Sequence, residues 1–253
     1  MRTIRIAMCQ IICLDGDRSG NFVRIENALR ESKAAQADIA CFPETAILGW
    51  VNPEAHQKAY PIPGEDTKRL SELAAQYQMY ICIGLAEKSG KNLFDSAVLI
   101  DDAGRILLTH RKINLLPELM TPPYTPGTAI ATVATALGRI GLLICADTFK
   151  EEILTRMAKK KPDLLLVPYG WAAPENQWPE HGKAMEKVII NATRTIGASV
   201  VGANLVGMIS HGPWTGRLYG GQSVAVDKDG NILARGKDRE RDIIVFPLSM
   251  ATK

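Results

Sequence analysis

The pattern of apolar and polar positions predicts strands alternating with helices. Apolar runs bounded by turn residues are typical of buried strands, and apolar residues spaced by three and four are typical of helices. Strands are expected at 3–11, 37–42, 80–86, 94–100, 105–109, 140–144, 164–167, 199–203, 223–226, 232–234 and 243–246. Helices are expected after Asp17 or Ser19, around Leu70 to Tyr77, after Asp147-Thr148, and at 180–196 before Gly197.

The predicted order β, α, β, α, followed by meandering strands, occurs twice along the chain. No low-complexity linker separates the halves, so we expect one α/β domain over residues 1–253 with a shared core. Two long irregular stretches, 45–63 and 113–127, are rich in proline. Loops of that length in a compact domain are usually functional.

Composition narrows the classes of function. The chain has 46% hydrophobic and 23% charged residues, as in ordinary globular proteins, and a formal net charge of +3. The densest basic spots, 159–161 and 235–241, are short, so we expect solvated surface there and no nucleic-acid interface. No apolar segment reaches the roughly 18 residues that cross a bilayer, and the N-terminus has no signal-peptide pattern. We therefore expect a cytoplasmic protein that does not bind membranes.

The spacing of cysteine and histidine predicts no metal site. The five cysteines show no Cys-x-x-Cys spacing and are expected in strand core, apart from Cys145, and the four histidines are not paired. No phosphate-binding glycine loop is present, so no cofactor is expected. A redox-active thiol is disfavoured because no second cysteine lies near Cys145 in the sequence.

Three reactive residues stand where predicted strands give way to loops: Glu44, Lys112 and Cys145. A turn between strand and helix is a setting in which a nucleophile is held for attack, with backbone N–H groups nearby to bind an oxyanion. A carboxylate can take the proton of a thiol, and an ammonium can stabilise the thiolate and the developing oxyanion. These residue types suffice for acyl transfer from an amide, although a buried structural cysteine is the alternative.

Several short motifs resemble the signatures of the nitrilase, or carbon-nitrogen hydrolase, superfamily. In chain order they are Phe42-Pro43-Glu44, Arg111-Lys112 and Leu143-Ile144-Cys145-Ala146-Asp147. The resemblance covers nearly the whole chain. Two further stretches are similar to the aromatic-x-Pro-Gly that follows the family's lysine and to its C-terminal hairpin: Tyr124-Thr125-Pro126-Gly127, and Gly221-Gln222-Ser223 with Asp229-Gly230-Asn231-Ile232-Leu233.

The resemblance implies a four-layer α-β-β-α sandwich of the nitrilase type, whose subunits pair into dimers or larger assemblies. It implies Cys145 as the nucleophile, Glu44 as the general base and Lys112 as the oxyanion stabiliser. Many relatives carry a second glutamate a few residues after the lysine. Glu118 is the only acid between Lys112 and Gly127, so that role is carried to Glu118, with a solvent-facing loop acid as the alternative.

The pocket is expected to include Tyr124, Ala146 and Trp171, which lie beside the motifs or in loops that follow strands. Ala146 departs from the aromatic or polar residue that usually follows the family's cysteine, and it offers only its backbone N–H to an oxyanion. Nitrile-cleaving members commonly read Cys-Trp-Glu at this point. The Cys-Ala-Asp of this chain therefore favours amide substrates.

We predict a hydrolase that cleaves a non-peptide carbon–nitrogen bond of a small linear amide or carbamoyl compound through a cysteine thioester, releasing ammonia. The alternatives are a nitrilase and a catalytically silent binding or scaffold relative, and the complete Glu-Lys-Cys set disfavours the silent relative. A cation for a substrate carboxylate is left open among Arg139, Lys150, Lys183 and Arg217.

Overall fold

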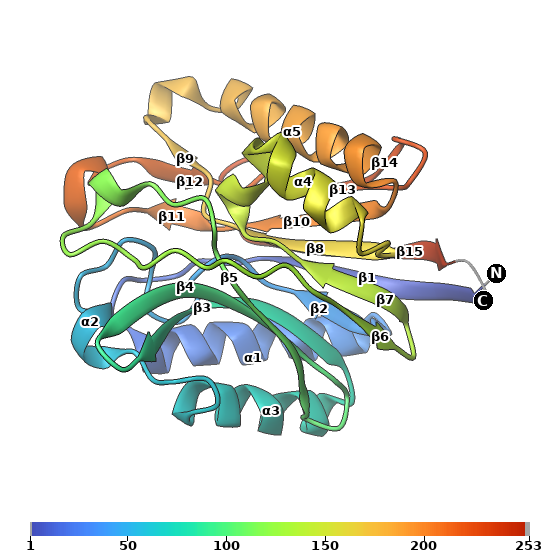
Figure 1. Ribbon diagram of the computed structural model, residues 1–253, viewed down its shortest axis with the longest axis horizontal. Helices are drawn as coiled ribbons and strands as arrows, with labels where there is room; N and C mark the ends of the chain where they lie inside the picture. The colour runs from blue at the N-terminus through green and yellow to red at the C-terminus, as the bar shows by residue number, and fades with distance from the viewer. Residues whose placement is uncertain (1, 251–253) are drawn as a thin grey trace.

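The computed structural model describes residues 2–250, and its strands and helices alternate much as the sequence pattern predicts (Figure 1). The α-helices are α1 (Arg18–Ala34), α2 (Ala55–Lys58), α3 (Glu65–Tyr77), α4 (Glu151–Ala158) and α5 (Glu180–Ile196). Short 3₁₀ turns are η1 (Pro117–Leu119), η2 (Cys145–Phe149), η3 (Glu175–Gln177) and η4 (Gly212–Trp214). The Asp17 side chain accepts a hydrogen bond from Gly20 N–H at the start of α1, and Gly197 ends α5 in the left-handed conformation, as predicted.

Two six-stranded sheets and one small sheet hold the strands. The first sheet has the order β15 (Asp242–Met250), β1 (Arg2–Gln10), β2 (Ile39–Cys41), β3 (Tyr80–Ser89), β4 (Asn92–Ile100) and β5 (Ile106–Arg111). The second has the order β14 (Ile232–Arg235), β13 (Val224–Val226), β10 (Ser199–Asn204), β8 (Leu164–Tyr169), β7 (Gly138–Leu142) and β6 (Thr132–Thr135). The small sheet joins β11 (Val206–Met208), β12 (Leu218–Gly220) and β9 (Ala172–Ala173).

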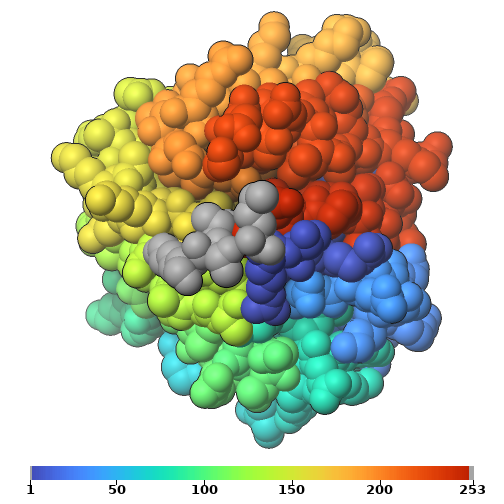
Figure 2. Space-filling view, turned by 90° about the vertical axis from the view of Figure 1, so that its right-hand side faces the viewer, coloured from blue at the N-terminus to red at the C-terminus, as the bar shows by residue number. Residues whose placement is uncertain are grey.

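The repeated order of elements that the sequence predicts is confirmed. In the first sheet β1, β2 and β3 run parallel with α1 and α3 between them, and in the second sheet β7, β8 and β10 run parallel with α4 and α5 between them. Each sheet continues into antiparallel strands. β15 then returns to pair with β1, so the red C-terminal strand lies beside the dark blue N-terminal strand in Figure 2.

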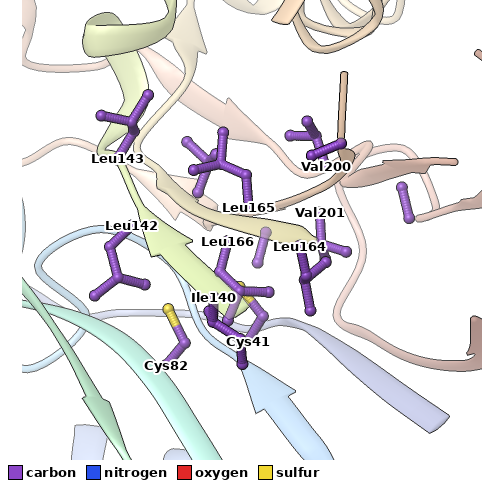
Figure 3. Close-up of a cluster of buried hydrophobic side chains, with 14 of the residues drawn as sticks. Cys41, Cys82, Ile140, Leu142, Leu143, Leu164, Leu165, Leu166, Val200 and Val201 are labelled. Atoms are coloured by element: carbon purple, nitrogen blue, oxygen red, sulfur yellow. The ribbon is translucent and has the colours of Figure 1, made fainter. Parts of the chain in front are cut away.

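The two sheets pack face to face, with α1 and α3 outside the first and α4 and α5 outside the second (Figure 1). Figure 3 shows the alternation that makes this possible: Leu142 and Leu166 point toward Cys41 and Cys82 of the facing sheet, and Leu143 points to the opposite face. This four-layer α-β-β-α sandwich is the predicted fold. Cys9, Cys41 and Cys82 lie in buried strands, as predicted, whereas Cys13 is buried in the loop that follows β1. All five cysteines are free thiols.

The differences from the predicted elements have local causes. β6, β9, β11 and β12 span two to four residues, which is too short to show a period. β8 continues beyond its predicted end at residue 167, because Pro168 still pairs with Ala203 in the parallel ladder. Among residues 2–250, no helix combines the length and the apolar character that crossing a membrane requires.

Candidate active site

Glu44 lies just after β2, completely buried between the two sheets. Its N–H donates to the carbonyl of Tyr169 at 3.3 Å, which ties the turn of the first sheet to the end of β8. β3 approaches this turn so closely at Gly84 that a Cβ there would lie 2.5 Å from the Glu44 Cα. Only glycine therefore fits at position 84 without displacing the backbone of Glu44.

Lys112 follows β5 directly and is also buried, with 2% of the residue exposed. Its N–H donates to the Asp95 carbonyl and its carbonyl accepts from Gly127 N–H, each at 2.8 Å. The ammonium donates a hydrogen bond to Glu44 Oε1 and lies 5.5 Å from the centre of the Trp50 ring. Burial opposes the charge, but the neighbouring acids, Glu44 before Asp95, outweigh burial and hold the pKa of Lys112 well above its usual value.

Cys145 opens η2 with φ of +39°, in the left-handed region that residues other than glycine rarely adopt. Its side chain interacts with Glu44 and Lys112. Burial and the Glu44 carboxylate raise the pKa of the Cys145 thiol well above its usual value, while Lys112 and the backbone of Gly170 act in the opposite direction. The resting thiol is therefore neutral, and attack requires a base that removes its proton.

Asp147 connects the nucleophile turn to the loop that follows Lys112. Its Oδ1 accepts from the N–H groups of Ile113 and Asn114 at 2.9 and 2.8 Å, and its Oδ2 accepts from Ile144 N–H at 3.1 Å. Oδ2 also lies 2.8 Å from Nε2 of the buried His110. The prediction that Asp147-Thr148 caps the following helix is wrong, because α4 begins after Lys150 and the carboxylate has these other donors.

A pocket of about 240 Å³ opens over Cys145. Ala146 and Trp171 line it, as expected, and so does Gly170, where a Cβ would lie 2.9 Å from Glu44 Oε2. The other apolar and aromatic wall residues are Trp50, Leu116, Phe149, Ala172, Ala173, Pro174 and Trp214. Three polar side chains complete the walls: Gln177, His181 and Arg217. Arg217 is thus the member of the four candidate cations that the structure brings to the pocket.

Glu118 and Tyr124 lie elsewhere than the sequence suggests. Glu118 is exposed in η1 and does not line the pocket over Cys145. Glu118 is therefore a solvent-facing loop acid, which is the alternative that the sequence left open. Tyr124 is buried behind the lysine, in the wall of a small cavity of about 10 Å³ that Asp95 and Lys112 also line.

The second acid beside the lysine, after Glu44, is Asp95 on β4. Its Oδ2 is 3.4 Å from Lys112 Nζ and the residue is 1% exposed. Sequence reasoning missed it because Asp95 falls inside the apolar run that predicts β4. The available signal was the residue itself, since a lone acid in a buried strand is rare unless it is paired.

The remaining site chemistry offers no arrangement for a metal ion. Within residues 2–250, no three histidine, cysteine or acidic side chains are grouped as metal ligands. The buried pairs described above are instead ion pairs and hydrogen bonds among Glu44, Lys112, His110 and Asp147. What the arrangement can do is move one proton between a thiol and a carboxylate beside a fixed positive charge.

Comparison with known proteins places this site in a family. The family model described as carbon-nitrogen hydrolase matches residues 5–252. An (R)-stereoselective amidase from Pseudomonas sp. is 29% identical over 248 residues, which cover 97% of this chain and 85% of that protein. A bifunctional nitrilase/nitrile hydratase from Nicotiana tabacum is 26% identical over 188 residues, covering 66% of this chain and 53% of that protein.

A solved structure of an amidase from Nesterenkonia sp. AN1 has the same fold, with a TM-score of 0.82 and 22% sequence identity. The match covers 97% of this chain and 90% of that one. The family model, the fold and the ordered Glu-Lys-Cys motifs agree over almost the full length of the sequence. The chain therefore belongs to the carbon-nitrogen hydrolase family, as a cysteine-dependent enzyme.

Proposed function

We propose that the protein hydrolyses a small linear amide or carbamoyl compound, releasing ammonia, through a thioester on Cys145. The observation that carries the proposal is the buried Glu44–Lys112 ion pair beside the thiol at the base of the pocket. Lys112 engages Oε1 of Glu44, and among residues 2–250 no group hydrogen-bonds Oε2. Oε2 is therefore the oxygen that accepts the thiol proton.

In the first half of the reaction, the Cys145 sulfur attacks the amide carbon as Glu44 takes its proton. The carbonyl oxygen becomes an oxyanion, which Lys112 and the N–H of Ala146 stabilise. The carbon–nitrogen bond then breaks, the proton passes from Glu44 to the departing nitrogen, and ammonia leaves a thioester behind. In the second half Glu44 takes a proton from water, whose oxygen attacks the thioester and releases the acid and the free thiol.

The names of the relatives support an amide over a nitrile. The first relative is an amidase, and the structure from Nesterenkonia carries the acetamide moiety of fluoroacetamide on its active-site cysteine. The nitrilase/nitrile hydratase matches a smaller share of this chain. The Cys-Ala-Asp sequence favours the same choice. Burying a lysine between two acids costs desolvation and is often no more stable than apolar packing, so a silent scaffold would not need this arrangement.

A paired panel tests this proposal. Straight-chain aliphatic amides and nitriles of equal carbon number are incubated with the protein, and ammonia is measured, with Cys145→Ala as the control. We expect ammonia from the amides, little from the nitriles, and none with Cys145→Ala. Equal release by Cys145→Ala, or release from nitriles alone, would overturn the amidase proposal.

The pocket wall suggests which amides fit. Arg217 stacks on the Trp214 ring, with 4.1 Å from its guanidinium carbon to the ring centre, and no acidic residue within the described range 2–250 lines the pocket. Burial and the Arg217 charge together lower the pKa of His181, so Arg217 is the fixed cation there. An amide with an apolar chain and a carboxylate at its far end complements these walls.

The matched substrates are the half-amide of a linear dicarboxylic acid and the alkyl amide of equal length. Arg217→Gln should lower kcat/KM for the half-amide by about 10²-fold, as expected for loss of a charge-assisted hydrogen bond, and leave the alkyl amide nearly unchanged. Equal effects on both substrates would exclude Arg217 as the carboxylate site.

We also propose an assembly and a compartment for the protein. The family resemblance supports a homodimer or higher assembly, which light scattering of the purified protein tests directly. The five free thiols fit a reducing cytoplasm.

A further inference from the structure

The charges around Lys112 do not balance if every acid is ionised. Glu44, Asp95 and Lys112 are 0%, 1% and 2% exposed, and the Cys145 thiol between them and the pocket is neutral. Two carboxylates and one ammonium leave one net negative charge among side chains that are almost fully buried. Such a charge is strongly disfavoured, so one of the two acids retains a proton.

The contacts indicate which acid that is. The Lys112 ammonium hydrogen-bonds Glu44 Oε1 but stands 3.4 Å from Asp95 Oδ2. Neither oxygen of Asp95 has a hydrogen-bond donor among residues 2–250. Asp95 and Glu44 both face the same ammonium, and interaction with Glu44 through its charge and a side-chain hydrogen bond raises the pKa of Asp95. Two ionised carboxylates would have no proton with which to form such a bond.

We propose that Asp95 is a neutral carboxylic acid that donates a hydrogen bond to Glu44 and thereby positions the Glu44–Lys112 pair. Asp95 does not touch the substrate, so it is a positioning residue. Its value to the reaction rests on the proposed amidase function. Burial and the neighbouring Glu44 raise the pKa of Asp95 well above its usual value, although Lys112 acts against them, which agrees with the geometry.

The groups that face Asp95 leave it no other partner. Glu44 comes from the end of β2, Lys112 from the end of β5, and Tyr124 from the loop before β6. Burial and the two acids raise the pKa of Tyr124, so its hydroxyl is neutral, and that hydroxyl has no hydrogen-bond partner among residues 2–250. The cavity they share is near the lower limit for one water molecule.

A neutral Asp95 serves the chemistry in a way that an ionised one does not. When Glu44 takes the thiol proton, Glu44 becomes neutral, and the full charge of Lys112 faces the developing oxyanion. An ionised Asp95 at 3.4 Å would remain as a counter-charge and weaken that stabilisation. The protonated acid holds Glu44 and Lys112 in place without neutralising the lysine.

The first test needs no substrate. The infrared C=O stretching band of neutral carboxyl groups is compared between wild type and Asp95→Asn, and the band of Asp95 should be missing from the variant. Asp101→Asn is the matched control, because Asp101 follows the same strand, is equally buried, and has its pKa lowered by hydrogen bonds from Arg105 that outweigh burial. That substitution should leave the band unchanged. An identical band in wild type and Asp95→Asn would show that Asp95 is ionised and would overturn the proposal.

The second test uses kinetics and pH. Asp95→Asn should keep kcat within about threefold, since an amide also donates to Glu44, whereas Asp95→Ala should lower kcat by about tenfold or more with KM nearly unchanged. Raising the pH ionises Asp95 in the wild type, so activity should fall at a lower pH in the wild type than in Asp95→Asn.

Three results decide the kinetic test, with folding checked by thermal denaturation. A loss of 10² or more in kcat for a folded Asp95→Asn would show that the negative charge is required. Equal losses of kcat in Asp95→Asn and Asp95→Ala would exclude the positioning role. So would a fall of activity at the same alkaline pH in the wild type and in Asp95→Asn. If the wild type turned over no amide, the proposed function would fail while the infrared test of Asp95 still stood.

Discussion

Gly170→Ala tests whether the Glu44 carboxylate must sit where the structure places it. Gly170 follows β8 and lies in the pocket wall, and a Cβ on it would be 2.9 Å from Glu44 Oε2 and 3.5 Å from Trp50 Cγ. Carbon–oxygen contacts ordinarily lie at about 3.3–3.6 Å, so the methyl group and the carboxylate must separate by roughly 0.4–0.7 Å. Glu44 is fully buried and held by Lys112, so the displacement falls on the catalytic pair.

The expected loss follows from that distance. A misplacement of about 1 Å can cost about 10² in rate, so about half of it should lower kcat by about tenfold. The assay is steady-state ammonia release from an amide that the wild type hydrolyses, together with thermal unfolding. Crowding of this kind costs about 1–3 kcal/mol of stability, so the protein should remain folded at the assay temperature.

Gly141→Ala is the matched control, because its Cβ would meet Met157 Sδ at 2.8 Å, in the core and away from the pocket. It should lower the melting temperature without lowering kcat. A Gly170→Ala protein with wild-type kcat would refute the reasoning that the position of Glu44 limits the rate.

Other substitutions and probes test the remaining parts of the site. Lys112→Met should lower kcat by about 10² or more. Lys112→Arg should not restore kcat, because a planar guanidinium does not fit the place of an ammonium, and normal turnover by this variant would exclude the oxyanion role. Asp147→Asn should lower both the melting temperature and kcat, because the wild-type carboxylate accepts hydrogen bonds from three backbone N–H groups and from His110. An unchanged kcat would show that this network does not hold the nucleophile. Iodoacetamide should label Cys145 before the other four thiols. The labelling rate should rise with pH, because the raised pKa of the Cys145 thiol leaves little thiolate at neutrality, and a rate independent of pH would mean that this thiol is already ionised.

The sequence predicts the fold and the Glu-Lys-Cys set well because both depend on local patterns. Strands with strong apolar runs and the helix ended by Gly197 appear where expected. Glu44, Lys112 and Cys145 each stand at the end of such a strand, and strand ends of the two facing sheets meet at one edge. Their roles in catalysis stay a prediction until the variants are measured.

The rest of the site could not be predicted because it depends on where loops and single side chains point. Glu118 lies in a proline-rich loop without a period, so its exposure has no signature in the sequence. Asp95 lies within a clear strand pattern, but the apolar residues around it indicate only a buried strand and give no sign of which group the acid contacts. Asp147 has the right type for a helix cap, and only the approach of residues 113 and 114 from another segment shows what it binds.

The most direct test of the central claim is intact-protein mass spectrometry of Glu44→Gln with a reactive ester substrate. Glutamine keeps the shape of Glu44 and can accept a hydrogen bond from Lys112, but it cannot take a proton from the water that hydrolyses the thioester. The account predicts a folded, nearly inactive protein on which any acyl group that the reactive ester places on Cys145 persists, while the wild type clears the adduct and Glu44→Gln/Cys145→Ala acquires none. Near wild-type turnover by Glu44→Gln, or an equal adduct on the protein without Cys145, would contradict it.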